Sequence, residues 1–205
     1  MAVLGTFMAM SSATLYLSFK YMDAGIASTI LFSYPIITAV LMTAFFHERI
    51  TWSTTFSILL AVTGIGLLYR GGDNVTLSTV GVALVLLSSL FYAFYIIGVN
   101  QTHTGLSAIQ FTFWVVSYSR LVLSVIMGEQ IQVLSTPKQW TCAAQLALLP
   151  TVLSLYFMNI SIENVGSTPS AIMGAVEPVT AVFIGVLIFG ESFSLRLFVG
   201  ILLIT

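Results

Sequence analysis

The sequence predicts an all-α fold, a polytopic transmembrane helical bundle, and three observations support this prediction. Of the 205 residues, 58% are hydrophobic and only 6% are charged, whereas a soluble domain has about 25% charged residues. The apolar residues stand in blocks close to the roughly 20 residues that a helix needs to cross a bilayer. The blocks are continuously apolar and do not alternate with polar residues, which argues against a transmembrane β-barrel.

Taken in order along the chain, the apolar blocks predict seven spans and the beginning of an eighth. The predicted spans cover residues 2–19, 25–46, 52–69, 78–99, 107–127, 140–160 and 167–189, and the eighth starts near Leu195. The eleven residues from Leu195 to Thr205 would rise only about 16 Å as a helix, roughly half of the hydrocarbon core. We therefore expect the sequence to be a fragment of a longer bundle, incomplete at both ends.

The composition and the absence of known motifs exclude several classes of protein. The net charge is −1 and the six Lys and Arg residues are scattered, so no nucleic-acid partner is expected. Cys142 is the only cysteine, which rules out an internal disulfide and a cysteine metal cluster. The first 19 residues have no basic segment, which favours a span over a signal peptide. No G-x-S-x-G, P-loop or H-E-x-x-H motif is present, so we expect no enzyme, no cofactor and no metal.

A proline followed thirteen residues later by a glutamate occurs twice, as Pro35 with Glu48 and as Pro178 with Glu191. The two copies are 143 residues apart, and this interval contains five predicted spans. An odd number of spans reverses the direction of crossing, so the copies form an inverted repeat, as in many secondary transporters. We predict that the prolines superimpose after inversion, and likewise the glutamates. Both glutamates are interpreted as turn residues near the N-terminus of the next helix.

Glu177 is the strongest candidate for a functional side chain. It lies ten residues into an apolar block, where a carboxylate costs several kcal/mol unless it is paired, protonated or facing water. Pro178 follows it and frees a backbone carbonyl one turn earlier. Ser170, Met173 and Thr180 share its helical face. Glu177 is therefore interpreted as a cavity residue that binds a cationic group or carries a proton, the alternative being a structural hydrogen bond.

Other polar side chains at membrane depth complete the candidate substrate-binding site. Arg120 lies near the middle of its block and must meet a carboxylate, carbonyls or water, so it either binds an anionic substrate group or pairs with Glu177. Tyr34 occupies in the first copy the position of Glu177 in the second. The remaining candidates have polar tips that suit an amphipathic solute, although such residues also hold helices together. They are Tyr92, Tyr95, Trp114 and Asn159.

These motifs resemble a known family. The stretch from Tyr21 through Tyr34-Pro35 to Thr51 is similar to the EamA-type repeat of the drug/metabolite transporter superfamily, and residues 177–191 are similar to its second copy. The resemblance implies ten spans in two inverted five-span repeats, of which this chain covers spans three to nine and the start of the tenth. On that division, residues 1–75 form the second part of the first repeat, and residues 76–205 form the second repeat.

The sequence thus predicts a secondary transporter that works by alternating access around a midplane cavity. The resemblance implies export of an amino acid or related metabolite and a multi-pass location in the bacterial inner membrane. The expected partners are a small-molecule substrate, protons as a candidate coupling ion, and membrane lipid, while the oligomeric state is left open. The alternatives are a non-transporting membrane subunit, a membrane-embedded enzyme and a sugar-phosphate carrier, which would need several deep Lys or Arg residues.

The direction in which the chain crosses the membrane stays open at this stage. One set of alternating loops contains Lys20, Arg70, Lys138 and Arg196, and the positive-inside rule would place these loops in the cytoplasm. The topology implied by the resemblance places the loop with Glu48 there instead. We favour the latter, since the difference between the two sets of loops is only a few charges.

Overall fold

The computed structural model describes residues 1–22, 24–47, 52, 55–56, 59–60, 63, 78–102, 105–128, 135–174, 176–177, 180 and 187. The regular structure of this part of the chain is helical, which confirms the all-α prediction. The helices are α1 (Ala2–Ser18), α2 (Ala24–Leu31), α3 (Tyr34–Phe46), α5 (Thr79–Gln101), α6 (Ala108–Met127), α7 (Pro137–Leu146), the π-helix η2 (Ala147–Leu153), α8 (Ser154–Val165) and α9 (Ser167–Met173).

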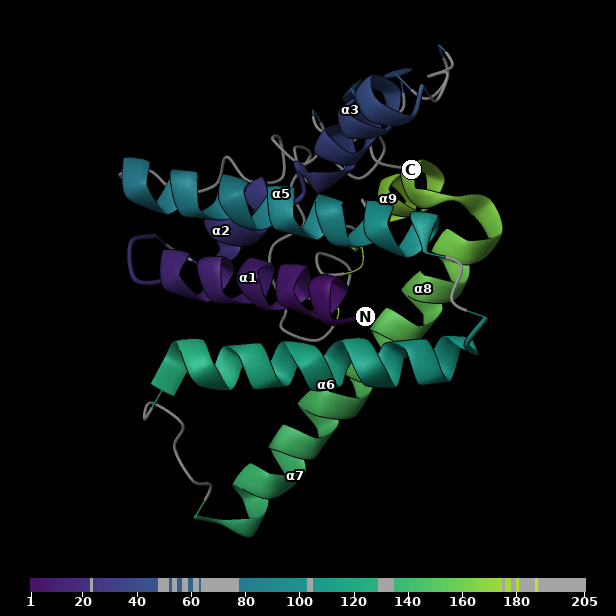
Figure 1. Cartoon of the computed structure of the whole chain (residues 1–205). Coiled ribbons are helices and arrows are strands. Elements are labelled where there is room, and N and C mark those ends of the chain that lie inside the picture. Colours follow the sequence, from purple (N-terminus) through teal and green to yellow (C-terminus); the bar gives the residue numbers. More distant parts are fainter. Residues whose placement is uncertain are drawn as a thin grey trace.

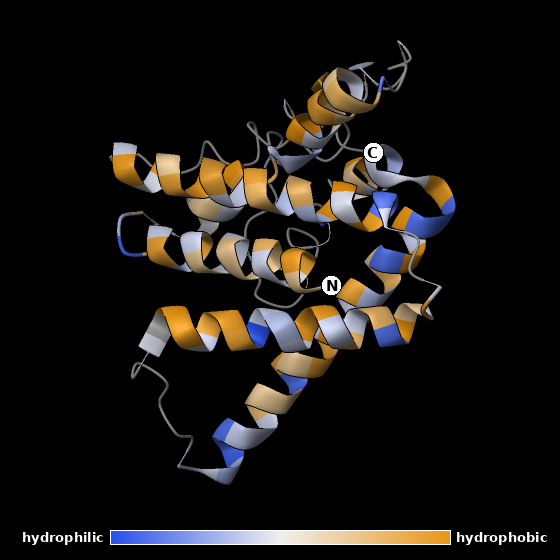
Figure 2. Cartoon of the chain, in the orientation of Figure 1, coloured by the Kyte–Doolittle hydropathy of each residue, from blue (hydrophilic) through white to orange (hydrophobic). Residues whose placement is uncertain are grey.

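Helix α1 lies between α5 and α6, and the three run side by side (Figure 1). The helical stretch from α7 through η2 to α8 crosses this layer at a steep angle, and α8 contacts both α5 and α6. Within the residues that the structure describes, three helical segments are long and apolar enough to cross a membrane, namely Thr79–Gln101, Ala108–Ile126 and Pro137–Val165. Apolar residues run along all of them, as Figure 2 shows.

Local sequence signals set where several helices begin. Ser78 precedes α5, and its hydroxyl accepts a hydrogen bond from the backbone N–H of Gly81 at 3.4 Å. Ser107 precedes α6, and its backbone N–H donates to the side chain of Gln110 at 3.2 Å. Such pairs satisfy backbone N–H groups that lack a partner in the first turn. The predicted spans 78–99 and 107–127 therefore begin within a residue or so of the observed helices.

The predicted span 25–46 corresponds to two helices, α2 and α3, with a break at the turn of Phe32 and Ser33 between them. Pro35 has no N–H and cannot bond to the carbonyl of Leu31 one turn earlier. That carbonyl instead accepts a hydrogen bond from the hydroxyl of Ser89 on α5, at 3.1 Å. A neighbouring helix thus satisfies the backbone group that the proline leaves free, which makes the break tolerable inside an apolar bundle.

A second proline is compensated in a similar way. The predicted span 140–160 is longer in the structure, and its centre is the π-helix η2, which contains Pro150. The carbonyl of Leu146, four residues before this proline, accepts a hydrogen bond from the hydroxyl of Thr151 at 3.2 Å. Insertions of this kind change the direction of a helix, and here α7 and α8 continue on either side of it.

Two short helices begin at matching positions of the proposed repeat. Helix α2 starts at Ala24 and α9 starts at Ser167, the same 143 residues apart as the two repeat prolines. Helix α9 ends at Met173, and the carbonyl of Gly174 accepts the backbone N–H of Glu177 at 3.0 Å. Glu48, Pro178, Glu191 and the eighth span lie outside the described residues, as does most of span 52–69. The predicted superposition of the two copies therefore stays a prediction.

Helices α1 and α6 are in backbone contact at Gly5. A Cβ atom added there would lie 2.5 Å from the Cβ of Tyr118 and 3.1 Å from the carbonyl oxygen of Val115. We expect Gly5→Leu to force α1 away from α6 and to lower stability by about 1–3 kcal/mol, measured as a lower melting temperature in detergent. Val3→Leu is the matched control, because Val3 is 65% exposed on the same helix. Equal melting temperatures for the two variants would contradict this packing.

Candidate functional site

Three tyrosines from two helices form a cluster beside the break between α2 and α3. The rings of Tyr34 on α3 and Tyr92 on α5 meet edge to face, with centroids 4.8 Å apart and an interplanar angle of 86°. Tyr92 and Tyr95 stack with centroids 6.0 Å apart. Tyr34 and Tyr95 are buried, with 3% and 0% of their surface exposed, and Tyr92 is partly buried. The structure thus brings together three of the predicted site residues.

A chain of hydrogen bonds extends from this cluster across the bundle. The hydroxyl of Tyr95 donates to Asn159 Oδ1 on α8 at 2.7 Å. Asn159 Nδ2 in turn donates to the hydroxyl of Thr112 on α6 at 3.0 Å. Asn159 and Thr112 are both buried. The predicted site residue Asn159 therefore links three helices, while Thr112 was not predicted, although its spacing from Val115 and Ser119 marks the inner face of α6.

The C-terminal end of helix α9 lies close to the tyrosine cluster, where Gly174 contacts Tyr34. A Cβ atom at Gly174 would overlap the hydroxyl of Tyr34, so only glycine allows the two to lie this close. Glu177 follows three residues later, and its backbone N–H donates to the carbonyl of this same Gly174 at 3.0 Å. Its own side chain is exposed. The expectation that this side chain points into a polar cavity within reach of Tyr34 therefore stays a prediction.

Arg120 and Trp114 lie away from the cluster. Both side chains are on the exposed side of α6, and Trp114 packs at 5.7 Å and 6.1 Å against the rings of Phe113 and Tyr118 on its own helix. The inner face of α6 carries Val115 and other buried residues instead. The structure does not bring Arg120 to Glu177, and no ion pair joins these two described residues.

Further hydroxyl groups make the interior of this bundle polar. Ser88 on α5 donates to the backbone carbonyl of Ser11 on α1 at 2.8 Å, and the two hydroxyl oxygens lie 3.1 Å apart. The hydroxyl of Ser33, in the helix break beside Tyr34, is buried and has no hydrogen-bond partner in the structure. An unpartnered buried hydroxyl beside Tyr34 is available to a polar group of a bound solute.

We looked next for side chains that could ligate a metal ion among the residues that the structure describes. No group of three or more His, Cys, Asp or Glu side chains lies close enough together there to hold a metal ion. Cys142 is exposed. The groups that this arrangement offers to a solute are aromatic faces, hydroxyl groups, an amide and one carboxylate.

Comparison with known proteins assigns the family. The family model of the EamA-like transporters matches residues 1–70 and 79–205. The chain belongs to the EamA-like transporter family. This confirms the resemblance drawn from the repeated proline and glutamate, and with the apolar helices it identifies an integral membrane protein.

Relatives of this EamA-like chain are bacterial proteins of larger size. It is 29% identical over 198 residues to a Synechocystis protein named uncharacterized transporter sll1319, covering 93% of this chain and 59% of that protein. It is 24% identical to the uncharacterized transporter YdfC of Bacillus subtilis, covering 88% of this chain and 60% of the relative. The chain thus spans about three fifths of the length of these curated relatives.

A solved structure shares the fold. Titled only as the crystal structure of a protein, it matches with a TM-score of 0.84 at 14% identity, covering 99% of this chain and 72% of its own. At that identity the match concerns the arrangement of the helices alone.

Proposed function

We propose that this chain is part of a secondary transporter that moves a small organic metabolite by alternating access around the polar interior between α3, α5, α6, α8 and α9. The buried cluster of Tyr34, Tyr92 and Tyr95, continued by Asn159 and Thr112, carries the proposal. Polar groups inside an apolar bundle are costly and in transporters mark the substrate pathway. The broken helix beside the cluster is a second feature typical of transporter binding sites.

We further propose that the chain contains two inverted repeats, divided at residues 1–75 and 76–205. Two observations support this division. The family model matches in two segments, 1–70 and 79–205. Helices α2 and α9 also begin at equivalent positions and end at the turn before Tyr34-Pro35 and Glu177-Pro178. In this arrangement Tyr34 and Glu177 lie on opposite sides of the pseudo-twofold axis and face one site.

The chemistry of the site favours an amphipathic organic solute. Aromatic rings contact an apolar body, while the amide, the hydroxyl groups and Glu177 contact a polar or cationic end. Export of an amino acid or related metabolite, driven by protons that Glu177 carries, is the form that we propose, in a bacterial inner membrane. A sugar-phosphate carrier is less well supported, because Arg120 lies outside the cluster.

The test is transport of a panel of radiolabelled amino acids and amines by a complete protein that contains this chain, reconstituted in liposomes, because the 205 residues alone are not expected to transport. We expect substrate flux that Tyr92→Ala reduces about tenfold, since one aromatic contact of 1.4 kcal/mol corresponds to that factor. Tyr16→Ala is the matched control, because Tyr16 is 55% exposed on α1 and should leave flux unchanged. Equal flux for both variants would overturn the site, and no flux for any solute would favour a non-transporting subunit.

A further inference from the structure

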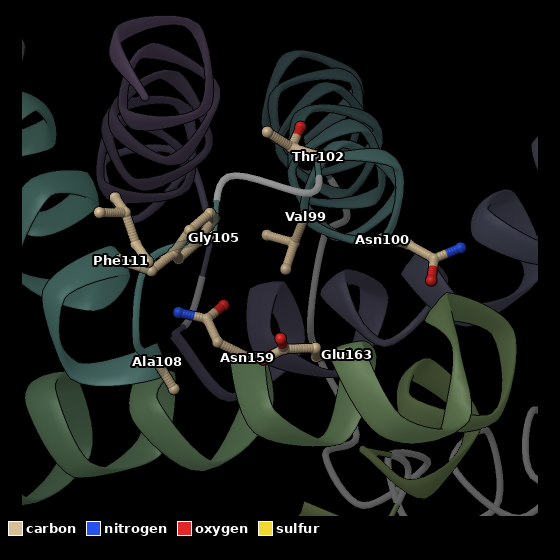
Figure 3. A pocket seen from close by; sticks show the side chains of 9 residues that line it. Val99, Asn100, Thr102, Gly105, Ala108, Phe111, Asn159 and Glu163 are labelled. Carbon is tan, nitrogen blue, oxygen red and sulfur yellow. The ribbon is translucent and has the colours of Figure 1, made fainter.

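A pocket of about 280 Å³ opens where α5 ends and α6 begins, at one end of the bundle. Figure 3 shows Asn159 and Glu163 rising from α8 toward Val99 and the segment between α5 and α6. The volume is close to the lower end of the range for small-molecule sites, about 300–1,000 Å³. The walls are Val99, Asn100, Thr102, Gly105, Leu106, Ala108, Phe111, Asn159 and Glu163.

Three polar side chains of this pocket, those of Thr102, Asn159 and Glu163, offer hydrogen-bond acceptors, while Asn100 has both an acceptor oxygen and N–H donors. The hydroxyl proton of Thr102 is already donated to the carbonyl of Gly98 at 2.6 Å, which leaves only the oxygen lone pairs for a ligand. Asn159 Oδ1 receives one hydrogen bond from Tyr95 and has a second lone pair. The carboxylate of Glu163 is an acceptor when ionised. No Lys or Arg is among the described residues that line the pocket.

We propose that this pocket binds the primary ammonium group of a small organic amine, with Glu163 as its counter-charge. An ammonium group carries three donors and no acceptor, which matches the acceptors of Glu163, Thr102 and Asn159. Phe111 and Val99 supply apolar walls for the carbon chain of the amine. Glu163 and Asn159 are four residues apart and therefore lie on one face of α8, so both contact the same ligand.

The position of the pocket gives it a role in transport. Asn159 forms its inner wall and also bonds to Tyr95 of the tyrosine cluster. Only the side chain of Asn159 thus separates a solute bound at Glu163 from the tyrosine cluster. In this proposal the solute binds first in the pocket and then at the cluster. That role rests on the proposed transport function, whereas binding of the amine does not and is measured without any flux.

The test follows the reactivity of a cysteine placed in the pocket wall. Ala108→Cys is introduced together with Cys142→Ser, because the native Cys142 is exposed and would also react. Butylammonium is expected to slow maleimide labelling of residue 108 in the reconstituted protein, while butanol and butyrate at the same concentration do not. Glu163→Gln should raise the butylammonium concentration for half protection about tenfold, the loss expected for one charged hydrogen bond.

A second variant tests whether binding depends on a carboxylate inside the pocket or only on the net charge of the protein. Glu163→Gln with Asn164→Glu keeps the net charge but moves the carboxylate by one residue, about 100° around the helix. Asn164 is exposed, and its side-chain amide donates to the carbonyl of Ile160 on its own helix at 2.7 Å. We expect this double variant to bind as weakly as Glu163→Gln. Recovery of protection, or equal protection by butanol, would overturn the proposal, even if the protein transports other solutes.

The ammonium group could come from a free amine or from the headgroup of phosphatidylethanolamine. Labelling is therefore compared in vesicles of phosphatidylcholine and phosphatidylglycerol with and without phosphatidylethanolamine. If the natural ligand is a free amine, labelling in the absence of butylammonium should proceed at the same rate in both kinds of vesicle. Slower labelling in the ethanolamine lipid, abolished by Glu163→Gln, assigns the same site to a lipid headgroup. Thr102→Val removes an acceptor without touching the charge and should weaken butylammonium protection in either vesicle.

Discussion

Glu177→Gln in a complete protein that contains this chain is expected to abolish transport, or to make it independent of the proton gradient, while insertion into the membrane is unchanged. The substitution keeps the size of the side chain and removes its charge, so the packing around Gly174 and Tyr34 is preserved. If Glu177 binds a cationic group or carries a proton, the loss of the charge removes that step from the cycle. The measurement is flux into proteoliposomes with and without a pH gradient, normalised to the amount of inserted protein.

Glu177→Asp is the control, because it retains the carboxylate and shortens the side chain by one carbon. We expect partial transport that still responds to the gradient. Tyr34→Phe tests the hydroxyl that lies against Gly174, three residues before Glu177. An unchanged rate and unchanged pH dependence for Glu177→Gln would reduce Glu177 to a packing residue and would remove protons from the proposed mechanism.

The sequence predicted the class of fold and several helix boundaries because these depend on local composition. A continuous apolar block can only satisfy its backbone as a helix in lipid, and residues such as Ser78 and Ser107 begin a helix by bonding to its first turn. The break before Tyr34 was not predicted, since hydropathy records which side chains are apolar and carries no information on backbone hydrogen bonds. Pro35 is the residue that signals the break, because it lacks the N–H that would bond to Leu31.

The site was predicted in part. Tyr34, Tyr92, Tyr95 and Asn159 do lie together, because each stands on a face with other small or polar residues. Arg120 was expected among them, yet it lies on the exposed side of α6. Membrane helices are apolar all round, so periodicity shows which residues share a face but not whether that face points inward.

Asn159→Leu is expected to destabilise the bundle more than any other substitution in the hydrogen-bond chain. It leaves the hydroxyl of Tyr95, which is 0% exposed, without an acceptor and takes from Thr112 its hydrogen-bond donor. A buried polar group without a partner costs about 1–3 kcal/mol, whereas an interhelical hydrogen bond in a membrane protein is worth about 0.6 kcal/mol on average. Most of the loss of stability therefore comes from the buried Tyr95 hydroxyl that has lost its hydrogen-bond acceptor. The measurement is the melting temperature in detergent.

The origin of this loss is tested by removing both partners. Asn159→Leu combined with Tyr95→Phe should recover much of the stability lost in Asn159→Leu alone, because no polar atom of this pair is then left unsatisfied. Asn164→Leu, on the exposed side of the same helix, should leave the melting temperature unchanged. If the double variant is no more stable than Asn159→Leu, the hydrogen bond between α5 and α8 does not hold these helices together. If the double variant is stable but transports no solute, the polar groups of Asn159 and Tyr95 are needed for binding the solute and not for the stability of the fold.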